Sequence, residues 1–578
     1  MRDLKYTEIL KANKTLGETM SGRTPYKIKV LSNIITSQLN EILEFVLRSE
    51  DINASATSGD YDNIVQDSKK YASWEAIVIF WELSNLVDGL QYKADMMSSE
   101  EADNLIEKTK SEIDFVFGQL ANAPNVIFNK FSSLVFSHSS IAENVFDKIC
   151  HALNGYVYAN LPANFTLIDI DRIFARLSIA RSVDFRYYYS SKSLYSLEFC
   201  KEYSRFVAPV ILSLLGKTRK ALIFDCDNTL WKGVVGEDGV DGIHLSAKNK
   251  NGNVFEEVQH LALALSKKGV MIGLCSKNNP EDVDEVFLKR EDLALKSKDI
   301  VIKRVNWNDK VTNLREIASA LNIGLDSLVF IDDSSFEVNY IRQDLGEVTT
   351  LQVPEKLYDY PALLRDNLGL FYKKSNTEED ANRTALYRTE ENRKMEREKF
   401  ATLDQYLSSL QLSMQITVND ESHIERAAQL TQKTNQFNLS THRYTDAELR
   451  RFISSGKYKM YLFSVADKFG DYGVTGMALV ARDNKEAVID TFLMSCRVIG
   501  RNIEVAFLNF ILTNLRAEGI DAVLAEYAGT MKNRQVESFY DDYGFSVRGT
   551  GNNEKSYFLD LHEHKYRNID YITLKPAK

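Results

Sequence analysis

The sequence contains few of the residues that mark disordered or cross-linked proteins. Only 8 prolines and 27 glycines occur among 578 residues, which excludes a chain made mainly of long disordered linkers. The cysteines, Cys150, Cys200, Cys226, Cys275 and Cys496, lie far apart and form no C-x-x-C pair. This pattern argues against a disulfide framework and a zinc site, and it is typical of the reducing cytoplasm.

Long apolar runs and an excess of positive charge are also missing. The opening segment has no apolar core of the signal-peptide type, and no run is long enough to cross a membrane. The formal net charge of -10 argues against nucleic acid as the main partner. We therefore expect a cytoplasmic protein with no membrane span and no nucleic-acid partner.

The remaining composition is that of a globular protein, with 26% charged and 44% apolar residues. A chain of this length is expected to form about three domains. Residues 1–215 mix strand-like and helical stretches, 216–372 alternate strand and helix more cleanly, and 409–578 form a third such unit. The charged segment 373–408 predicts a solvated helical linker. The expected fold class is α/β, with a Rossmann-like sheet in the middle domain.

Two aspartates follow the first strand expected in the middle domain. The apolar run Ala221–Phe224 leads directly into Asp225 and Asp227, within the pattern D-x-D-x-T. In a parallel sheet ligands collect at the carboxyl ends of the strands, so both side chains should project from one edge. Neighbouring carboxylates repel each other, and a divalent cation relieves that repulsion.

Three further elements of this domain carry groups suited to phosphate chemistry. The next strand ends in Ser276, Lys310 opens a later helix, and the strand after that ends in Asp332 and Asp333. A hydroxyl and a fixed cation can hold a phosphoryl group, and the acids can hold a metal. A lone D-x-D-x-T is a weak signal, but four elements in this order are a strong one. The plain alternative is that the carboxylates are helix caps or loop residues.

This set resembles the haloacid dehalogenase superfamily of aspartate-nucleophile phosphotransferases. The resemblance implies that Asp225 attacks phosphorus and that Asp227 protonates the leaving oxygen and then activates water. It also implies that Ser276 and Lys310 hold the phosphoryl group. Asp332 would complete a Mg²⁺ site with Asp225 and the Asp227 backbone carbonyl. Only residues 231–252 separate the first motif from the next helix, so a large cap domain is not expected.

Longer motifs resemble the FkbH-like family over residues 195–545, including "DCDNTLWKGVVGEDGVDGIHL", "LCSKNN", "LTQKTNQFNLSTHRYT" and "DTFLMSCRVIGR". Thr229 and Asn278 lie in these motifs and are expected to contact substrate. The resemblance implies a phosphorylated glycerate-like acyl donor, whose acyl group rests on an enzyme cysteine before transfer to an acyl carrier protein. Ser334 and Ser335 depart from the family, which commonly has Asn-Pro after the paired aspartates.

The last domain resembles the GNAT acyltransferase fold. Residues 497–502, "RVIGRN", are close to a pyrophosphate-binding turn that opens a helix, so Arg497 and Gly500 are candidate substrate contacts. Asn502 stands where a small residue is expected, which argues against ordinary acetyl-CoA use. Cys496, directly before this turn, is the candidate acyl carrier; the alternative is a small buried hydrophobe. His442 is a candidate base, but a lone histidine in a polar loop is more often plain surface.

The first domain faintly resembles the SGNH-hydrolase fold, with Ser32 at the position of its nucleophile. The glycine and aspartate that should precede this serine are missing, and no D-x-x-H motif supplies a histidine base. We expect a hydrolase-like scaffold without that activity.

Two other functions stay open for the whole chain. The first is a phosphatase for a small metabolite such as a sugar phosphate, in surface-polysaccharide biosynthesis, with the end domains as scaffolding. The second is a non-catalytic interaction protein, against which the intact set of acidic, hydroxyl and lysine residues counts.

Overall fold

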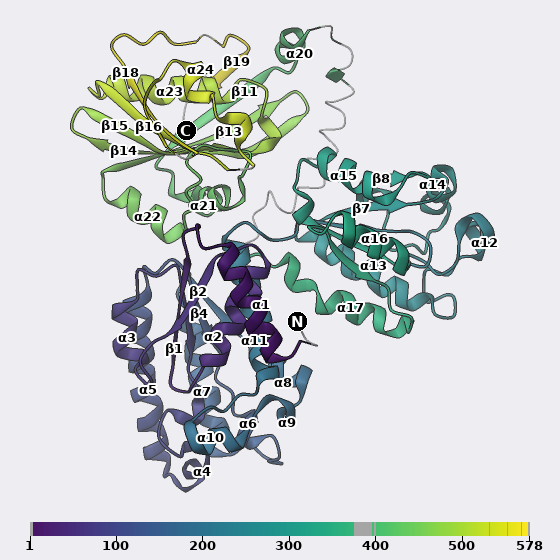
Figure 1. The fold of residues 1–578 in the computed structure, drawn as a ribbon, viewed down its shortest axis with the longest axis vertical. Coiled ribbons are helices and arrows are strands. Elements are labelled where there is room, and N and C mark those ends of the chain that lie inside the picture. The colour runs from purple at the N-terminus through teal and green to yellow at the C-terminus, as the bar shows by residue number, and fades with distance from the viewer. Residues whose placement is uncertain are drawn as a thin grey trace. The chain divides into compact units, whose positions relative to one another are not determined.

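The computed structural model describes residues 4–374, 396–397, 400, 402–530, 532–551, 553–567 and 569–575. By its internal contacts the chain divides into two compact units, residues 1–212 and 213–578. The predicted linker 373–408 lies largely outside the described residues. Figure 1 shows both units, coloured from the N-terminus to the C-terminus.

The N-terminal unit is built on a five-stranded sheet of order β2-β1-β3-β4-β5, in which every pair is parallel. Its strands are β1 Tyr26–Ser32, β2 Ala54–Ser58, β3 Ala76–Phe80, β4 Val126–Asn129 and β5 Phe165–Ile168. The longer helices are α1 Tyr6–Thr19, α2 Ser37–Ser49, α5 Ser99–Leu120, α7 Val145–Asn160 and α11 Leu197–Leu214. Every residue of β3 and β4 is buried, as expected for strands covered on both faces.

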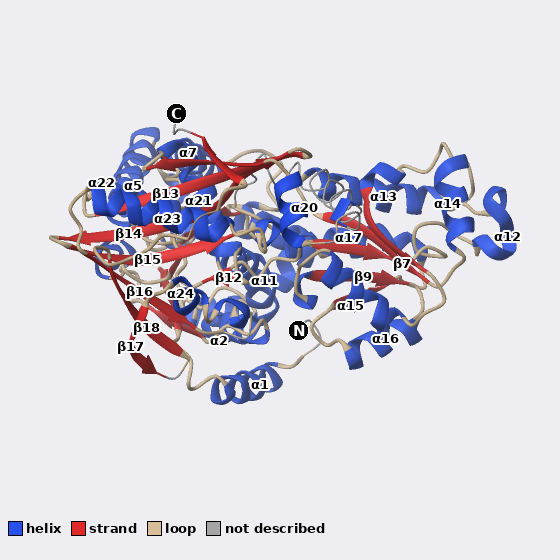
Figure 2. Ribbon diagram, turned by 90° about the horizontal axis from the view of Figure 1, so that it is seen from above, coloured by secondary structure: helices blue, strands red, loops and turns tan. Residues whose placement is uncertain are grey.

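The middle sheet is also entirely parallel, with the order β10-β9-β6-β7-β8. Its strands are β6 Ala221–Phe224, β7 Met271–Ser276, β8 Ile300–Val305, β9 Leu328–Asp332 and β10 Thr349–Gln352. The helices around it are α12 Val235–Gly242, α13 Gly252–Lys267, α14 Pro280–Lys289, α15 Lys310–Ala320, α16 Ser335–Asp344 and α17 Tyr360–Asp366. In Figure 2 helices lie on both sides of β7 and β9.

Alternation along β6 explains why helices cover both faces of this sheet. Leu222 and Phe224 join one buried cluster, which includes residues of α13, α14 and α17. Ala221 and Ile223 join a second cluster, which includes residues of α15 and α16. Successive side chains of a strand point to opposite faces, so a continuous apolar run requires cover on both sides. The run that predicted a buried strand therefore fixes the position of the acidic residues that follow it.

The C-terminal sheet is mixed and nine-stranded, with the order β17-β18-β16-β15-β14-β13-β11-β19 and β12 paired to β15. Its strands are β11 Leu412–Val418, β12 Phe437–Asn438, β13 Tyr458–Asp467, β14 Gly470–Asp483, β15 Glu486–Met494, β16 Ala522–Ala528, β17 Ser546–Gly551, β18 Glu554–Asp560 and β19 Ile572–Lys575. Its helices include α21 Ile424–Lys433, α22 Asp446–Ser454, α23 Ile503–Ala517 and α24 Phe539–Tyr543. The strands β15 and β16 run parallel, whereas most other neighbours are antiparallel.

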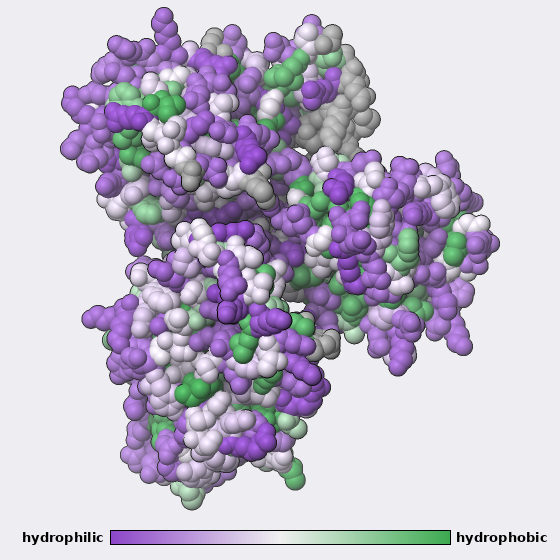
Figure 3. Space-filling model, in the orientation of Figure 1, coloured by the Kyte–Doolittle hydropathy of each residue, from purple (hydrophilic) through white to green (hydrophobic). Residues whose placement is uncertain are grey.

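These sheets confirm the predicted α/β class and the Rossmann-like middle domain. Within the described residues, no helix has the length and apolar character needed to cross a membrane. On the face shown in Figure 3 most residues are hydrophilic and the hydrophobic ones form small separate patches.

Candidate active site

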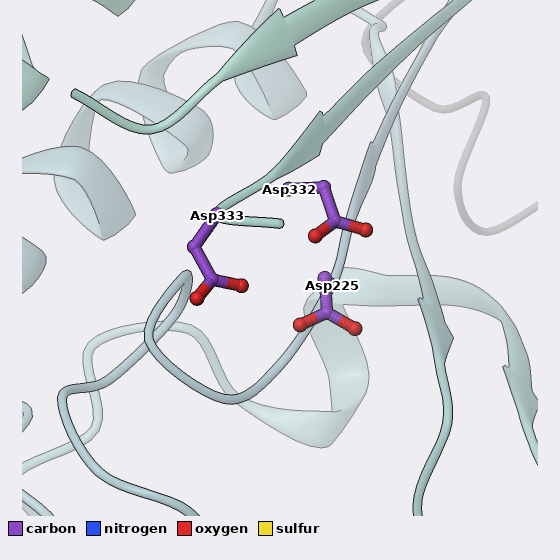
Figure 4. Close-up of side chains that lie close together, drawn as sticks. All are labelled: Asp225, Asp332 and Asp333. Carbon is purple, nitrogen blue, oxygen red and sulfur yellow. The ribbon is translucent and has the colours of Figure 1, made fainter. Parts of the chain in front are cut away.

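The carboxyl ends of β6 and β9 bring three aspartates together at one edge of the middle sheet. Asp225 directly follows β6, Asp332 is the last residue of β9, and Asp333 comes next. One oxygen from each carboxylate lies within 4.8 Å of the others, and Figure 4 shows the three side chains gathered at the strand ends. The two strands are neighbours in register, with Phe224 opposite Ile331, so the residues that follow them must meet.

Lys310 holds two of these carboxylates by direct contacts. Its ammonium nitrogen lies 2.8 Å from Asp225 Oδ1 and 2.6 Å from Asp332 Oδ2. Lys310 is 4% exposed, Asp225 is 6% exposed and Asp332 is fully buried. Asp309 caps helix α15 by accepting a hydrogen bond from the Thr312 amide, which fixes Lys310 at the first position of the helix.

The charges of this group shift one another's pKa values. Burial raises the pKa of Asp225; Lys310 opposes that rise and the Asp332 carboxylate adds to it. Burial alone would lower the pKa of Lys310, but the two carboxylates outweigh it and raise the pKa above its ordinary value. Lys310 is therefore a cation at neutral pH. Burial, followed by the charge of Asp332, raises the pKa of Asp333.

The three aspartates fit a hard divalent cation. Mg²⁺ prefers oxygen ligands, and carboxylates are the side chains that usually supply them. Asp332 Oδ1 also accepts a hydrogen bond of 2.9 Å from the Ser334 amide, which orients the carboxylate. Asp333 is the second residue of the pair in the sequence, where the family resemblance implies a metal ligand only for Asp332. The role of Asp333 here depends on the turn after β9, which sequence alone does not specify.

Asp227 occupies a separate hydrogen-bonded position. Its Oδ1 accepts hydrogen bonds from the Trp231 indole at 2.9 Å and from the Val235 amide at 3.0 Å. Its Oδ2 accepts one from the Asn278 amide group at 2.8 Å. These donors come from the segment after β6 and from the loop after β7, so they hold the carboxylate in one orientation. Trp231 was not expected as a partner, because its spacing from Asp227 gave no signal in the sequence.

Of the hydroxyl and amide residues predicted to bind substrate, two are hydrogen-bonded to each other and the third is buried without a hydrogen bond from its side chain to any described residue. Ser276 ends β7 and is 1% exposed, and its hydroxyl accepts a hydrogen bond of 3.4 Å from Asn278. Asn278 therefore joins Ser276 to Asp227. Thr229 is fully buried, and its Oγ1 has no hydrogen-bond partner in the part of the chain that the structure describes.

The edge of the sheet that carries this site has no large domain inserted over it. Between β6 and α13 the described chain forms only the short helix α12 and two isolated bridges, Asp227 to Trp231 and Lys232 to His244. This agrees with the expected absence of a cap.

The C-terminal candidates lie around the start of α23. Cys496 is partly exposed, whereas the other four cysteines are buried. It begins the short helix η8 Cys496–Val498, which also contains Arg497. Gly500 has a φ of 78°, a conformation that favours glycine in the turn before the helix. His442 lies elsewhere: its Nδ1 is 3.1 Å from the Asp490 carbonyl oxygen.

Among the described residues, no histidine forms a hydrogen bond with Ser32, which holds the expected nucleophile position. Ser32 ends β1, is 6% exposed, and its hydroxyl accepts a hydrogen bond from the Ile34 amide at 3.1 Å. A cavity of about 60 Å³ lies beside the segment after β1 and the last residue of β3. Its lining residues include Thr36, Phe80 and Tyr195, and no histidine is among them.

One solved structure resembles a large part of the chain. It is a crystal structure of the N-terminal part of the protein BF1531 from Bacteroides fragilis, which contains a phosphatase domain and is complexed with Mg. The two sequences are 26% identical, the TM-score is 0.56, and the match covers 64% of this chain and 100% of that chain.

Two acetyltransferase structures match a smaller part. A GNAT-family acetyltransferase from Staphylococcus aureus is 13% identical, with a TM-score of 0.21, over 26% of this chain and 99% of that one. An acetyl transferase from Salmonella typhimurium is 20% identical, with a TM-score of 0.20, over 25% of this chain and 93% of that one. Scores this low do not establish a shared fold, so the GNAT-like domain stays a prediction. No protein-family model and no curated protein matches the sequence.

Proposed function

We propose that the middle domain is an aspartate-nucleophile phosphatase or phosphotransferase of the haloacid dehalogenase type. The observation that carries this proposal is the buried ion-pair network in which Lys310 bridges Asp225 and Asp332 at the carboxyl edge of a parallel sheet. A buried cation between carboxylates is costly to build, and perturbed charged groups of this kind cluster at functional sites. The similarity to BF1531, whose structure contains a phosphatase domain, supports the same conclusion.

In the first step a carboxylate oxygen of Asp225 attacks phosphorus. The bond from phosphorus to the leaving oxygen breaks, and that oxygen takes a proton from Asp227, leaving an aspartyl phosphate on Asp225. Ser276 and Lys310 hold the phosphoryl oxygens, and the Lys310 charge offsets the negative charge that accumulates there.

In the second step water attacks the aspartyl phosphate. Water gives a proton to Asp227, the bond between phosphorus and the Asp225 oxygen breaks, and inorganic phosphate leaves. The hydrogen bonds from Trp231, Val235 and Asn278 keep Asp227 in place for both proton transfers. Asp225, Asp332 and Asp333 would hold Mg²⁺, which supplies positive charge for the phosphoryl oxygens.

The test is release of inorganic phosphate from a panel of phosphomonoesters in the presence of Mg²⁺. Asp225→Asn should abolish turnover, because an amide cannot form the acyl phosphate. Asp284→Asn is the matched control: Asp284 lies on α14, where it pairs with Lys303, and is 63% exposed at its side chain. Wild-type turnover in Asp225→Asn would contradict the assignment of the nucleophile. A sugar phosphate in the same panel tests the alternative substrate class directly.

A second function, coupled acyl transfer, is favoured by the position of Cys496. It is the one cysteine that is not buried, and it lies just before the turn that opens α23. We propose that the Cys496 sulfur attacks the acyl carbon of a glycerate-like donor phosphorylated on its carboxyl group. The bond from that carbon to the phosphate oxygen breaks, phosphate leaves, and the acyl group passes from the Cys496 thioester to an acyl carrier protein. Intact-mass spectrometry with the donor should show a hydroxylamine-sensitive gain on wild type and none on Cys496→Ala. No gain on wild type, with phosphate release intact, would favour the phosphatase alone.

A further inference from the structure

We propose that the side chains of Trp307 and Phe336, called the walls below, contact an apolar leaving group beside the phosphoryl site. This inference rests on the proposed phosphatase function without coupled acyl transfer, since a glycerate-like donor has no apolar face, and it adds the substrate class. The substrate would be a phosphomonoester whose leaving group presents an apolar or aromatic face beside the phosphate.

Trp307 contacts the loop that also holds Asp227, the residue assigned to protonate the leaving oxygen. It lies between β8 and α15, is 69% exposed, and its indole nitrogen donates a hydrogen bond of 3.0 Å to Asn279 Oδ1. The preceding residue, Asn278, donates to Asp227 Oδ2 at 2.8 Å. Two consecutive residues of the loop after β7 therefore hold the proton donor and the tryptophan, so a leaving group protonated by Asp227 emerges near the indole.

The residue after Phe336 contacts the same loop. Phe336 lies in the first turn of α16, just after the paired aspartates, and is 72% exposed. Its neighbour Glu337 accepts a hydrogen bond of 2.7 Å from Lys277, the residue before Asn278. The Phe336 ring stacks on Tyr340 one turn later, with ring centres 6.3 Å apart and planes 19° apart. Trp307 is thus linked to the loop of residues 277–279 directly, and Phe336 through its neighbour Glu337.

The exposure of these two rings is informative because of where they lie. Single exposed apolar side chains are common on protein surfaces. Here, however, both large rings follow strands whose carboxyl ends form the ligand-binding edge of the sheet. An enzyme without a large cap needs another surface to contact the part of the substrate beyond the phosphate. Leu288 illustrates the ordinary case: it is 84% exposed but lies near the far end of α14, away from this edge.

The kinetic test compares phenyl phosphate with glycerol phosphate as substrates of the full chain. Trp307→Ala and Phe336→Ala should each lower the ratio of kcat/KM for phenyl phosphate to that for glycerol phosphate by about tenfold, since a single methylene group in a hydrophobic pocket already discriminates by about 10- to 200-fold. Trp307→Phe, which keeps a ring, should recover most of the ratio. Leu288→Ala is the control and should leave the ratio at the wild-type value. Ratios for Trp307→Ala and Phe336→Ala equal to that of Leu288→Ala would overturn the proposal.

A binding test separates this inference from the proposed reaction. Of the four tryptophans, Trp81 and Trp231 are buried and Trp74 is partly buried, so Trp307 is the one most accessible to acrylamide. In Asp225→Asn, phenyl phosphate should protect this fluorescence from quenching, whereas inorganic phosphate should not. Trp307→Phe should remove the protected component. If the wild-type protein hydrolyses neither ester, the proposed function fails, and the protection from quenching alone decides whether the walls bind phenyl phosphate. Equal quenching with and without phenyl phosphate would refute the role of the walls.

Discussion

Replacing Lys310 by methionine is the sharpest test of the charge arrangement at the strand ends. Methionine has a similar length but no charge, so Asp225 and Asp332 would remain buried without their shared cation. Breaking a buried ion pair by removing one partner costs about 3–5 kcal/mol. At about 2–4 °C for each kcal/mol in a domain of this size, we expect the corresponding melting transition to fall by roughly 6–20 °C.

The measurement is calorimetry of the whole chain in EDTA, so that no metal replaces the lost charge. A second replacement, Asp225→Asn, should return part of the loss, because it removes one of the two uncompensated carboxylates. Coupling between residues in direct contact is about 0.5–3 kcal/mol, which is large enough to resolve in a double-mutant cycle. If Lys310→Met melts at the wild-type temperature, or if Asp225→Asn deepens its loss, the carboxylates are not held by this cation in the way described here.

Three further results are expected. Asp227→Asn should lower turnover by about 10²–10⁴-fold with the fold intact, since general acid–base catalysis contributes about that factor; wild-type kcat would exclude the role. Mg²⁺ should raise the melting temperature of the wild-type protein in titrations from EDTA, and Asp333→Asn should shrink that shift; an equal shift would remove Asp333 from the site. Asp490→Asn should lower the pKa of His442, because the Asp490 carboxylate, whose Oδ1 is 3.4 Å from Nδ1, raises it through a hydrogen bond and its charge. NMR titration of the His442 ring reads this directly, and an unchanged midpoint would be the contrary result.

The strands of the middle sheet could be predicted from the sequence because they are buried on both faces. Such strands are short continuous apolar runs, and Ala221–Phe224 is one of them. The strand pairing of the C-terminal sheet could not be predicted from the sequence in the same way. Its two-residue strand, Phe437–Asn438, pairs with β15 across about 55 residues of sequence, and a pairing so short and so distant leaves no local periodicity.

The candidate site was predictable where its residues end a strand or directly follow one. Asp225, Ser276 and Asp332 are placed by the ends of β6, β7 and β9. The partners of Asp227 were not predictable in the same way. The Trp231 indole and the Val235 amide reach its carboxylate through the path of the chain after β6, and turn geometry of this kind is not encoded by residue spacing alone.

A single lysine does not neutralise the negative charge of the site. Asp225, Asp332 and Asp333 converge on one point, and Lys310 supplies a single positive charge to the first two. When all three acids are ionised, the group keeps an excess of two negative charges in a buried setting. Burial and mutual repulsion push the pKa values of Asp225 and Asp333 upward, which is how a protein relieves such an excess without a metal. A divalent cation would relieve it with the carboxylates ionised, and only the ionised Asp225 can act as a nucleophile.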